Sequence, residues 1–83
     1  MKKLKTSEEL NHVGAAIKAA RKKAGLTQKE LADQLELIPV YICRGSISRI
    51  ENGTRAITDI ELAAIAKVLG VTPNDFFFWP PSK

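Results

Sequence analysis

Hydrophobic residues recur in the first third of the chain at the spacing of an α-helix. Leu10, Val13 and Ile17 are separated by three and four residues, which places them on one helical face. Gly25 follows a run of three cations, and a glycine after basic residues is typical of a helix end. The pattern predicts a first helix over about residues 7–24.

Capping boxes mark the starts of three predicted helices. In a Thr-x-x-Glu box, the two side chains bind each other's free backbone N–H groups at the helix N-terminus. The second predicted helix extends to about Leu37 and has to end near Pro39, and the fourth stops at Gly70. The boxes are Thr6–Glu9, Thr27–Glu30 and Thr58–Glu61.

Two further helices give an all-α fold. The third is expected from about Cys43 to the Asn52-Gly53 pair, and a short fifth helix has Pro73 at its first position. The sequence has no strand-like alternation and no internal repeat. We therefore predict five short helices in one domain. Its parts are a basic arm with the start of the first helix (residues 1–9), the domain itself (10–78) and a tail (79–83).

Composition narrows the function classes. One cysteine excludes an internal disulfide, and one histidine leaves neither a metal cluster nor a Ser-His-Asp set. There is no glycine-rich phosphate loop, secretory signal or membrane span. We therefore expect a cytoplasmic protein that is not an enzyme and has no cofactor, small-molecule ligand or membrane partner. The net charge is +4 and is concentrated in residues 1–30, which suits a nucleic-acid binder.

The second and third predicted helices form a helix-turn-helix pattern, in which the second of the two enters the DNA major groove. The run "LTQKELADQL…ISRIENGTR…IELAAIAKVLGVTPNDFF" closely resembles the phage-repressor and Cro-like family of bacterial regulators, also called lambda-repressor-like or XRE-type. The resemblance covers about residues 10–78. It implies a compact five-helix, lambda-repressor-like DNA-binding domain.

The resemblance assigns DNA contacts to the third helix and its flanks. An arginine can bind guanine O6 and N7 in the major groove, so Arg44 and Arg49 are the expected main base readers rather than merely solvated charges. The helix dipole independently favours a phosphate beside Gln28, at the start of the second helix. For Ser48, base contact and a tolerated polar surface position remain equal alternatives. The other base-contacting positions are Gly45 and Ser46, and the backbone-contacting positions are Thr27, Gln28, Lys29, Asn52, Thr54 and Arg55.

Two charged residues are expected to be structural. Arg21 and Glu51 match a pair that forms a salt bridge beneath the recognition helix in relatives. A partly buried carboxylate needs such a partner, because an unpaired buried charge is strongly destabilising. We therefore do not count Arg21 among the DNA ligands.

The turn between the two helices is longer than the usual family pattern, since eleven residues separate Leu35 from Ile47. The extra residues fall at about 36–41, and the sequence leaves open whether Tyr41 contacts DNA or packs. Cys43 takes the N-cap position of the third helix. A small, half-buried residue is the favoured interpretation there, and a redox-sensitive thiol is the alternative.

These features predict a sequence-specific regulator of transcription that binds double-stranded DNA, expected to act as a repressor. Relatives bind as dimers on palindromic operators with half-sites one helical turn apart. Phe76 to Trp79 is the candidate dimer surface, unless Phe76 and Phe77 belong to the core and Trp79 caps it. The alternatives are an antitoxin with a protein partner, a restriction-modification controller, or a protein-interaction module that has lost DNA binding. The expected location is the cytoplasm, on the nucleoid when bound to DNA.

Overall fold

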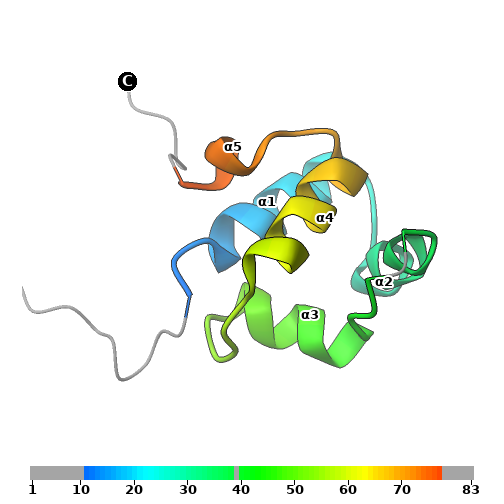
Figure 1. The fold of residues 1–83 in the computed structure, drawn as a ribbon, viewed down its shortest axis with the longest axis horizontal. Coiled ribbons are helices and arrows are strands. Elements are labelled where there is room, and N and C mark those ends of the chain that lie inside the picture. Colours follow the sequence, from blue (N-terminus) through cyan, green and yellow to red (C-terminus); the bar gives the residue numbers. More distant parts are fainter. Residues whose placement is uncertain (1–10, 39, 78–83) are drawn as a thin grey trace, which may run out of the picture.

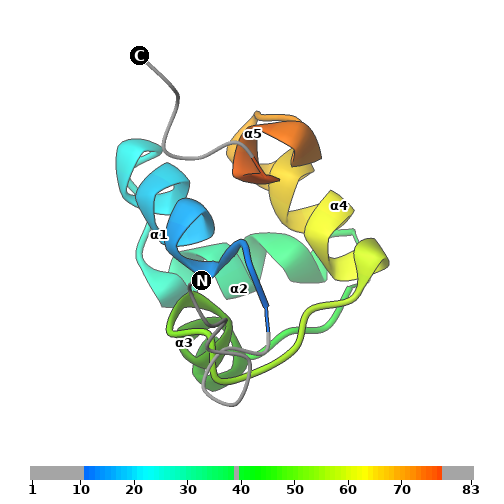
Figure 2. The ribbon, with the colours of Figure 1, turned by 90° about the vertical axis from the view of Figure 1, so that its left-hand side faces the viewer.

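The computed structural model describes residues 11–38 and 40–77. This part of the chain holds five helices and no strand, as predicted. In Figure 1, α1 and α4 overlap at the centre of the view, with α3 below them and α2 to the right, and the turned view places α1 and α4 on opposite sides of the molecule (Figure 2). In both views α3 lies on the side of the molecule opposite α5 (Figures 1 and 2). The helices are α1 (Gly14–Lys23), α2 (Gln28–Glu36), α3 (Arg44–Glu51), α4 (Asp59–Leu69) and α5 (Pro73–Phe77).

The predicted start of the first helix is wrong. Helix α1 begins at Gly14, and residues 11–13 are not helical. The Asn11 side chain explains this start, because its Oδ1 accepts the backbone N–H groups of Val13 at 3.1 Å and Gly14 at 2.7 Å. An Asn side chain that binds the backbone two and three residues on forms a turn in place of a helical continuation. The expected Thr6–Glu9 box lies outside the described residues.

The other predicted helix boundaries are confirmed to within a residue or two. Both described capping boxes are formed, with Thr27 and Thr58 each accepting the N–H of the glutamate three residues on. Helix α2 ends at Glu36, just before the predicted Leu37. Gly70 ends α4 with φ 75°, a left-handed conformation that glycine adopts without steric cost.

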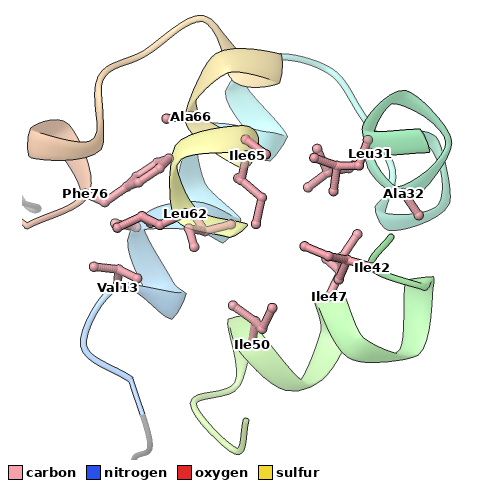
Figure 3. Packing of buried hydrophobic residues seen from close by; sticks show 14 residues of the cluster. Val13, Leu31, Ala32, Ile42, Ile47, Ile50, Leu62, Ile65, Ala66 and Phe76 are labelled. Atoms are coloured by element: carbon pink, nitrogen blue, oxygen red, sulfur yellow. The ribbon is translucent and has the colours of Figure 1, made fainter. Parts of the chain in front are cut away.

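Side chains from all five helices, together with Val13 and Ile42, form one hydrophobic core. Ile17 from α1 and Leu31 from α2 are fully buried, as are Ile47 and Ile50 on the inner side of α3. In Figure 3 the side chains of Leu31, Ile47, Ile65 and Phe76 point into the space between the helices. Burial of side chains of this size contributes roughly 1.5–3 kcal/mol each. The core therefore fixes which side of α3 remains outside.

Candidate nucleic-acid interface

Helix α3 has one buried side and one polar side. Ile47 and Ile50 are fully buried, so α3 cannot rotate about its axis without exposing them. On the opposite side Arg44, Gly45 and Arg49 are exposed. The two serines among the expected base readers, Ser46 and Ser48, are half-buried. The expected base-reading positions thus lie on or beside the polar side of α3.

Ser46 links Arg49 to the start of the helix. The guanidinium Nη2 of Arg49 donates to Ser46 Oγ at 3.2 Å, one helical turn away, and Cys43 Sγ donates to the same oxygen at 3.4 Å. Cys43 is exposed rather than half-buried, and it occupies the N-cap position without making a side-chain capping bond. In the thiolate form Sγ can instead accept from the Ser46 side chain and backbone, and these hydrogen bonds, with a smaller contribution from the Arg49 charge, lower the pKa of Cys43.

A buried ion pair supports α3 from below. Arg21 Nε donates to Glu51 Oε2 at 2.6 Å and Nη2 donates to Oε1 at 3.2 Å, with the two side chains 9% and 1% exposed. Arg21 Nη1 also donates to the Leu26 carbonyl at 2.7 Å. The guanidinium therefore faces the protein interior, and its bonds hold α1 against the last turn of α3. Bidentate, charge-assisted pairs of this kind are geometrically specific.

The Gln28 side chain joins the same carboxylate. Gln28 begins α2, and its Nε2 donates to Glu51 Oε1 at 3.0 Å. Glu51 thus accepts hydrogen bonds from α1 and α2 while it belongs to α3. The two chain neighbours of Gln28 are also expected phosphate contacts. Thr27 caps α2, because its side chain accepts the backbone N–H of Glu30. Lys29 is exposed and pairs with Asp33 at 3.1 Å.

The segment after α3 carries the other expected phosphate contacts. Asn52 and Thr54 are exposed, and Gly53 is buried with φ 80°. The Thr54 N–H and hydroxyl both donate to the Arg49 carbonyl, at 2.9 and 3.3 Å. These bonds fold the segment back against the end of α3 and fix where Asn52 and Thr54 lie.

The Arg55 guanidinium forms hydrogen bonds within the protein, which the sequence analysis did not predict. Its Nη1 and Nη2 donate to the two carboxylate oxygens of Glu61 at 3.1 and 3.0 Å, and Nη1 also donates to the Ala56 carbonyl at 2.9 Å. The Arg55 guanidinium lowers the pKa of Glu61 through this hydrogen-bonded contact. A guanidinium has five N–H donors, so Nε and one N–H of Nη2 still have capacity for a phosphate.

The described residues between α2 and α3, 37–38 and 40–43, divide between the core and the surface. Ile42 is buried, and Ile38 and Val40 pack partly against the core. Leu37 and Tyr41 are 82% and 77% exposed. Tyr41 therefore does not pack into the core, so contact with DNA is the remaining one of the two alternatives that the sequence left open. At the other end of the chain Phe76 is buried and Phe77 is 46% exposed, whereas Phe78 and Trp79 lie outside the described residues.

Among the described residues, no group of three metal-ligating side chains is found, and no helix is long and apolar enough to cross a membrane. The only histidine, His12, is exposed. Sequence reasoning missed two residues that shape the interface, Asn11 and the Arg55 partner Glu61. For Asn11, the available signal was its place three residues before Gly14, since an asparagine side chain can bind backbone N–H groups two or three residues on. Glu61 was recognised only as the glutamate of a capping box.

Comparison with known families and structures agrees with this architecture. The helix-turn-helix family model matches residues 17–76, which is most of the chain. The chain therefore belongs to the XRE, lambda-repressor-like helix-turn-helix family, a class whose members place the second helix of the motif in the DNA major groove. A comparison of the sequence with curated proteins finds no match.

Two similar solved structures are both of the clp gene regulator ClgR from Corynebacterium glutamicum. Each superimposes with a TM-score of 0.71 at 27% sequence identity and covers 81% of this chain. The matched region spans 66% of the first ClgR chain, slightly less than two thirds of its length, and 80% of the second. These structures show the same fold as the five helices described above.

Proposed function

We propose that this chain is a sequence-specific, double-stranded-DNA-binding regulator of transcription that acts as a repressor in the cytoplasm. One observation carries the proposal: α3 presents Arg44 and Arg49 outward while Ile47, Ile50 and Glu51 hold its other side in the domain. A bidentate arginine-guanine pair discriminates between bases by about 1–3 kcal/mol. The similarity to a clp gene regulator supports a role in transcription.

The remaining expected contacts are proposed to position the domain on the phosphate backbone. They flank α3 on two segments, with Thr27, Gln28 and Lys29 at the start of α2 and Asn52, Thr54 and Arg55 after α3. Contacts of this kind fix register and orientation without reading sequence. Each neutralised phosphate makes the fall of log affinity with log salt steeper by about 0.9.

Dimerisation on a palindromic operator is part of the proposal, because one module of this size buries too little surface for tight specific binding. Phe77 is the described residue of the expected dimer surface that remains exposed, whereas Phe76 belongs to the domain's own core. Sedimentation of the wild-type chain and of Phe77→Ser tests this assignment. A dimer that persists unchanged in the variant would place the interface elsewhere.

Selection of bound duplexes from a random DNA pool tests the function directly. We expect enrichment of a palindrome whose half-sites are about one helical turn apart, and binding that weakens steeply with salt. An absence of enrichment, with weak and salt-insensitive binding, would overturn DNA reading and favour a protein partner for α3. An antitoxin or a restriction-modification controller would give the same enrichment, and capture of a partner toxin would identify the first.

Single substitutions separate readers from positioning contacts. Arg49→Ala is expected to relax base preference at one operator position and cost about 1–3 kcal/mol on the selected site. Arg55→Ala is expected to weaken all sequences alike and reduce the salt slope by about one. Lys67→Ala removes an exposed cation near the end of α4 and serves as the matched control. Equal losses on selected and random DNA for Arg49→Ala would remove Arg49 from the readers.

A further inference from the structure

The Asn11 side chain forms hydrogen bonds that connect segments far apart in the chain. Its Nδ2 donates to the Ile50 carbonyl at 3.0 Å and to the Arg55 carbonyl at 2.8 Å. These acceptors lie 39 and 44 residues away along the chain. One carbonyl belongs to the last turn of α3 and the other lies just beyond Thr54. The two amide donors thus connect both ends of the segment 50–55.

That segment contains three of the proposed phosphate contacts, Asn52, Thr54 and Arg55. Its own hydrogen bonds run from Gly53 and Thr54 back to carbonyls of α3. Arg21 and Gln28 reach the segment at the Glu51 side chain, whereas Asn11 donates to its backbone and, among the described residues, forms the side-chain hydrogen bond that ties the Arg55 carbonyl to the start of α1. A donor amide with both hydrogens bound to carbonyls has little freedom left to move.

We infer that Asn11 is a positioning residue for DNA binding, which holds the phosphate-contacting segment 50–55 in its binding geometry by bridging the carbonyls of Ile50 and Arg55. The inference rests on the proposed function. Asn11 itself touches no DNA in this role. Its effect reaches the phosphates through the segment, because a contact that is held in place before binding loses less conformational freedom on binding.

The geometry separates this role from the role of Asn11 at the start of α1. There the Oδ1 oxygen accepts N–H groups, whereas the bridge uses the Nδ2 donors. A serine hydroxyl can accept the same N–H groups in the equivalent turn, but it is too short and has too few hydrogens to bridge two carbonyls. Asn11→Ser therefore removes the bridge and keeps the turn.

The test measures binding of wild-type protein and Asn11→Ser to the selected duplex and to random DNA across a series of salt concentrations. We expect about tenfold weaker binding to both duplexes and an unchanged preferred base sequence. The fall of log affinity with log salt should become shallower by the amount that about one phosphate contact contributes. Exchange of the Thr54 amide hydrogen should also become faster relative to the amides of α4. Asn74→Ser, an exposed asparagine on α5, is the control and should behave as the wild type.

Circular dichroism at the binding temperature establishes that Asn11→Ser is folded. If it is not, Asn11→Asp replaces it, because a carboxylate keeps an acceptor for α1 but has no hydrogen for the bridge. Binding by the variant with unchanged affinity and salt slope would overturn the role of Asn11 and leave the proposed function standing. No DNA binding by the wild-type chain would overturn the proposed function itself. A changed base preference in Asn11→Ser would also contradict a purely positioning role.

Discussion

Replacement of Gly14 by alanine should destabilise the domain, against the usual expectation for a helix. Gly14 is the first residue of α1, and alanine is favoured over glycine in helices by roughly 0.5–1 kcal/mol. A Cβ at this position, however, would overlap the Ile50 carbonyl oxygen and lie 3.0 Å from that of Glu51. Both are backbone atoms of α3, so neither can move without moving the helix.

The size of the effect follows from these two opposing terms. Ordinary contact begins near 3.4 Å, so α1 and α3 would have to separate by about 1 Å. Inserting atoms into a packed region typically costs about 1–3 kcal/mol, and a clash with backbone belongs at the upper end. After subtraction of the helix-propensity gain, we expect a net loss of about 2 kcal/mol, or about 8–16 °C in Tm for a domain of this size.

Gly45 provides the matched control for thermal and urea unfolding. It also lies within a helix, but a Cβ there would meet only Arg49 Nη1, at an ordinary 3.6 Å. Gly45→Ala should therefore raise stability by roughly 0.5–1 kcal/mol, as helix propensity predicts. The two glycine-to-alanine changes are expected to have opposite signs. A Gly14→Ala protein as stable as the wild type would refute the close contact between α1 and α3.

Three further outcomes are expected for stability. Arg21→Ala leaves the Glu51 carboxylate buried without its cation and should cost about 3–5 kcal/mol in urea unfolding; an unchanged Tm would rule out the buried pair. Thr58→Ala removes a helix cap and should cost about 0.5–2 kcal/mol, with unaltered unfolding contradicting the capping box. The pKa of Glu61 is lowered in the folded state, mainly by Arg55, so its contribution is present above the usual value of 4.5 and is lost as pH falls through the lower, folded-state pKa. Stability should therefore fall less steeply in acid for Glu61→Gln than for the wild type, and parallel pH profiles would contradict the pairing.

The sequence predicts the helices well because local signals mark their ends. Thr27, Thr58 and Gly70 act through neighbours within four residues, and such local chemistry is readable without a fold. The start of α1 was misplaced because Leu10 continues the hydrophobic spacing, whereas the Asn11 side chain redirects the backbone. The spacing of hydrophobic residues does not show where a side chain will bind the backbone and prevent the helix from continuing.

The candidate site was only partly predictable. The outward positions of α3 follow from the helical period once Ile47 and Ile50 are assigned to the core. The hydrogen-bond partners of Gln28 and Arg55 do not follow from the helical period, because Glu51 and Glu61 come within reach of them only after the chain has folded. Contacts between residues that are distant in sequence depend on helix packing, which a single sequence does not specify.

The attachment of three helices to the Glu51 carboxylate has a consequence for how this protein can diversify. The side chains that hold α3 in the domain are Ile47, Ile50 and Glu51, and none of them is a proposed reader. Substitution of Arg44 or Ser48 therefore leaves the supporting contacts intact. Under the proposed function, descendants of such a domain can acquire new operators by changing a few exposed side chains, while the same carboxylate keeps α3 in place against α1 and α2.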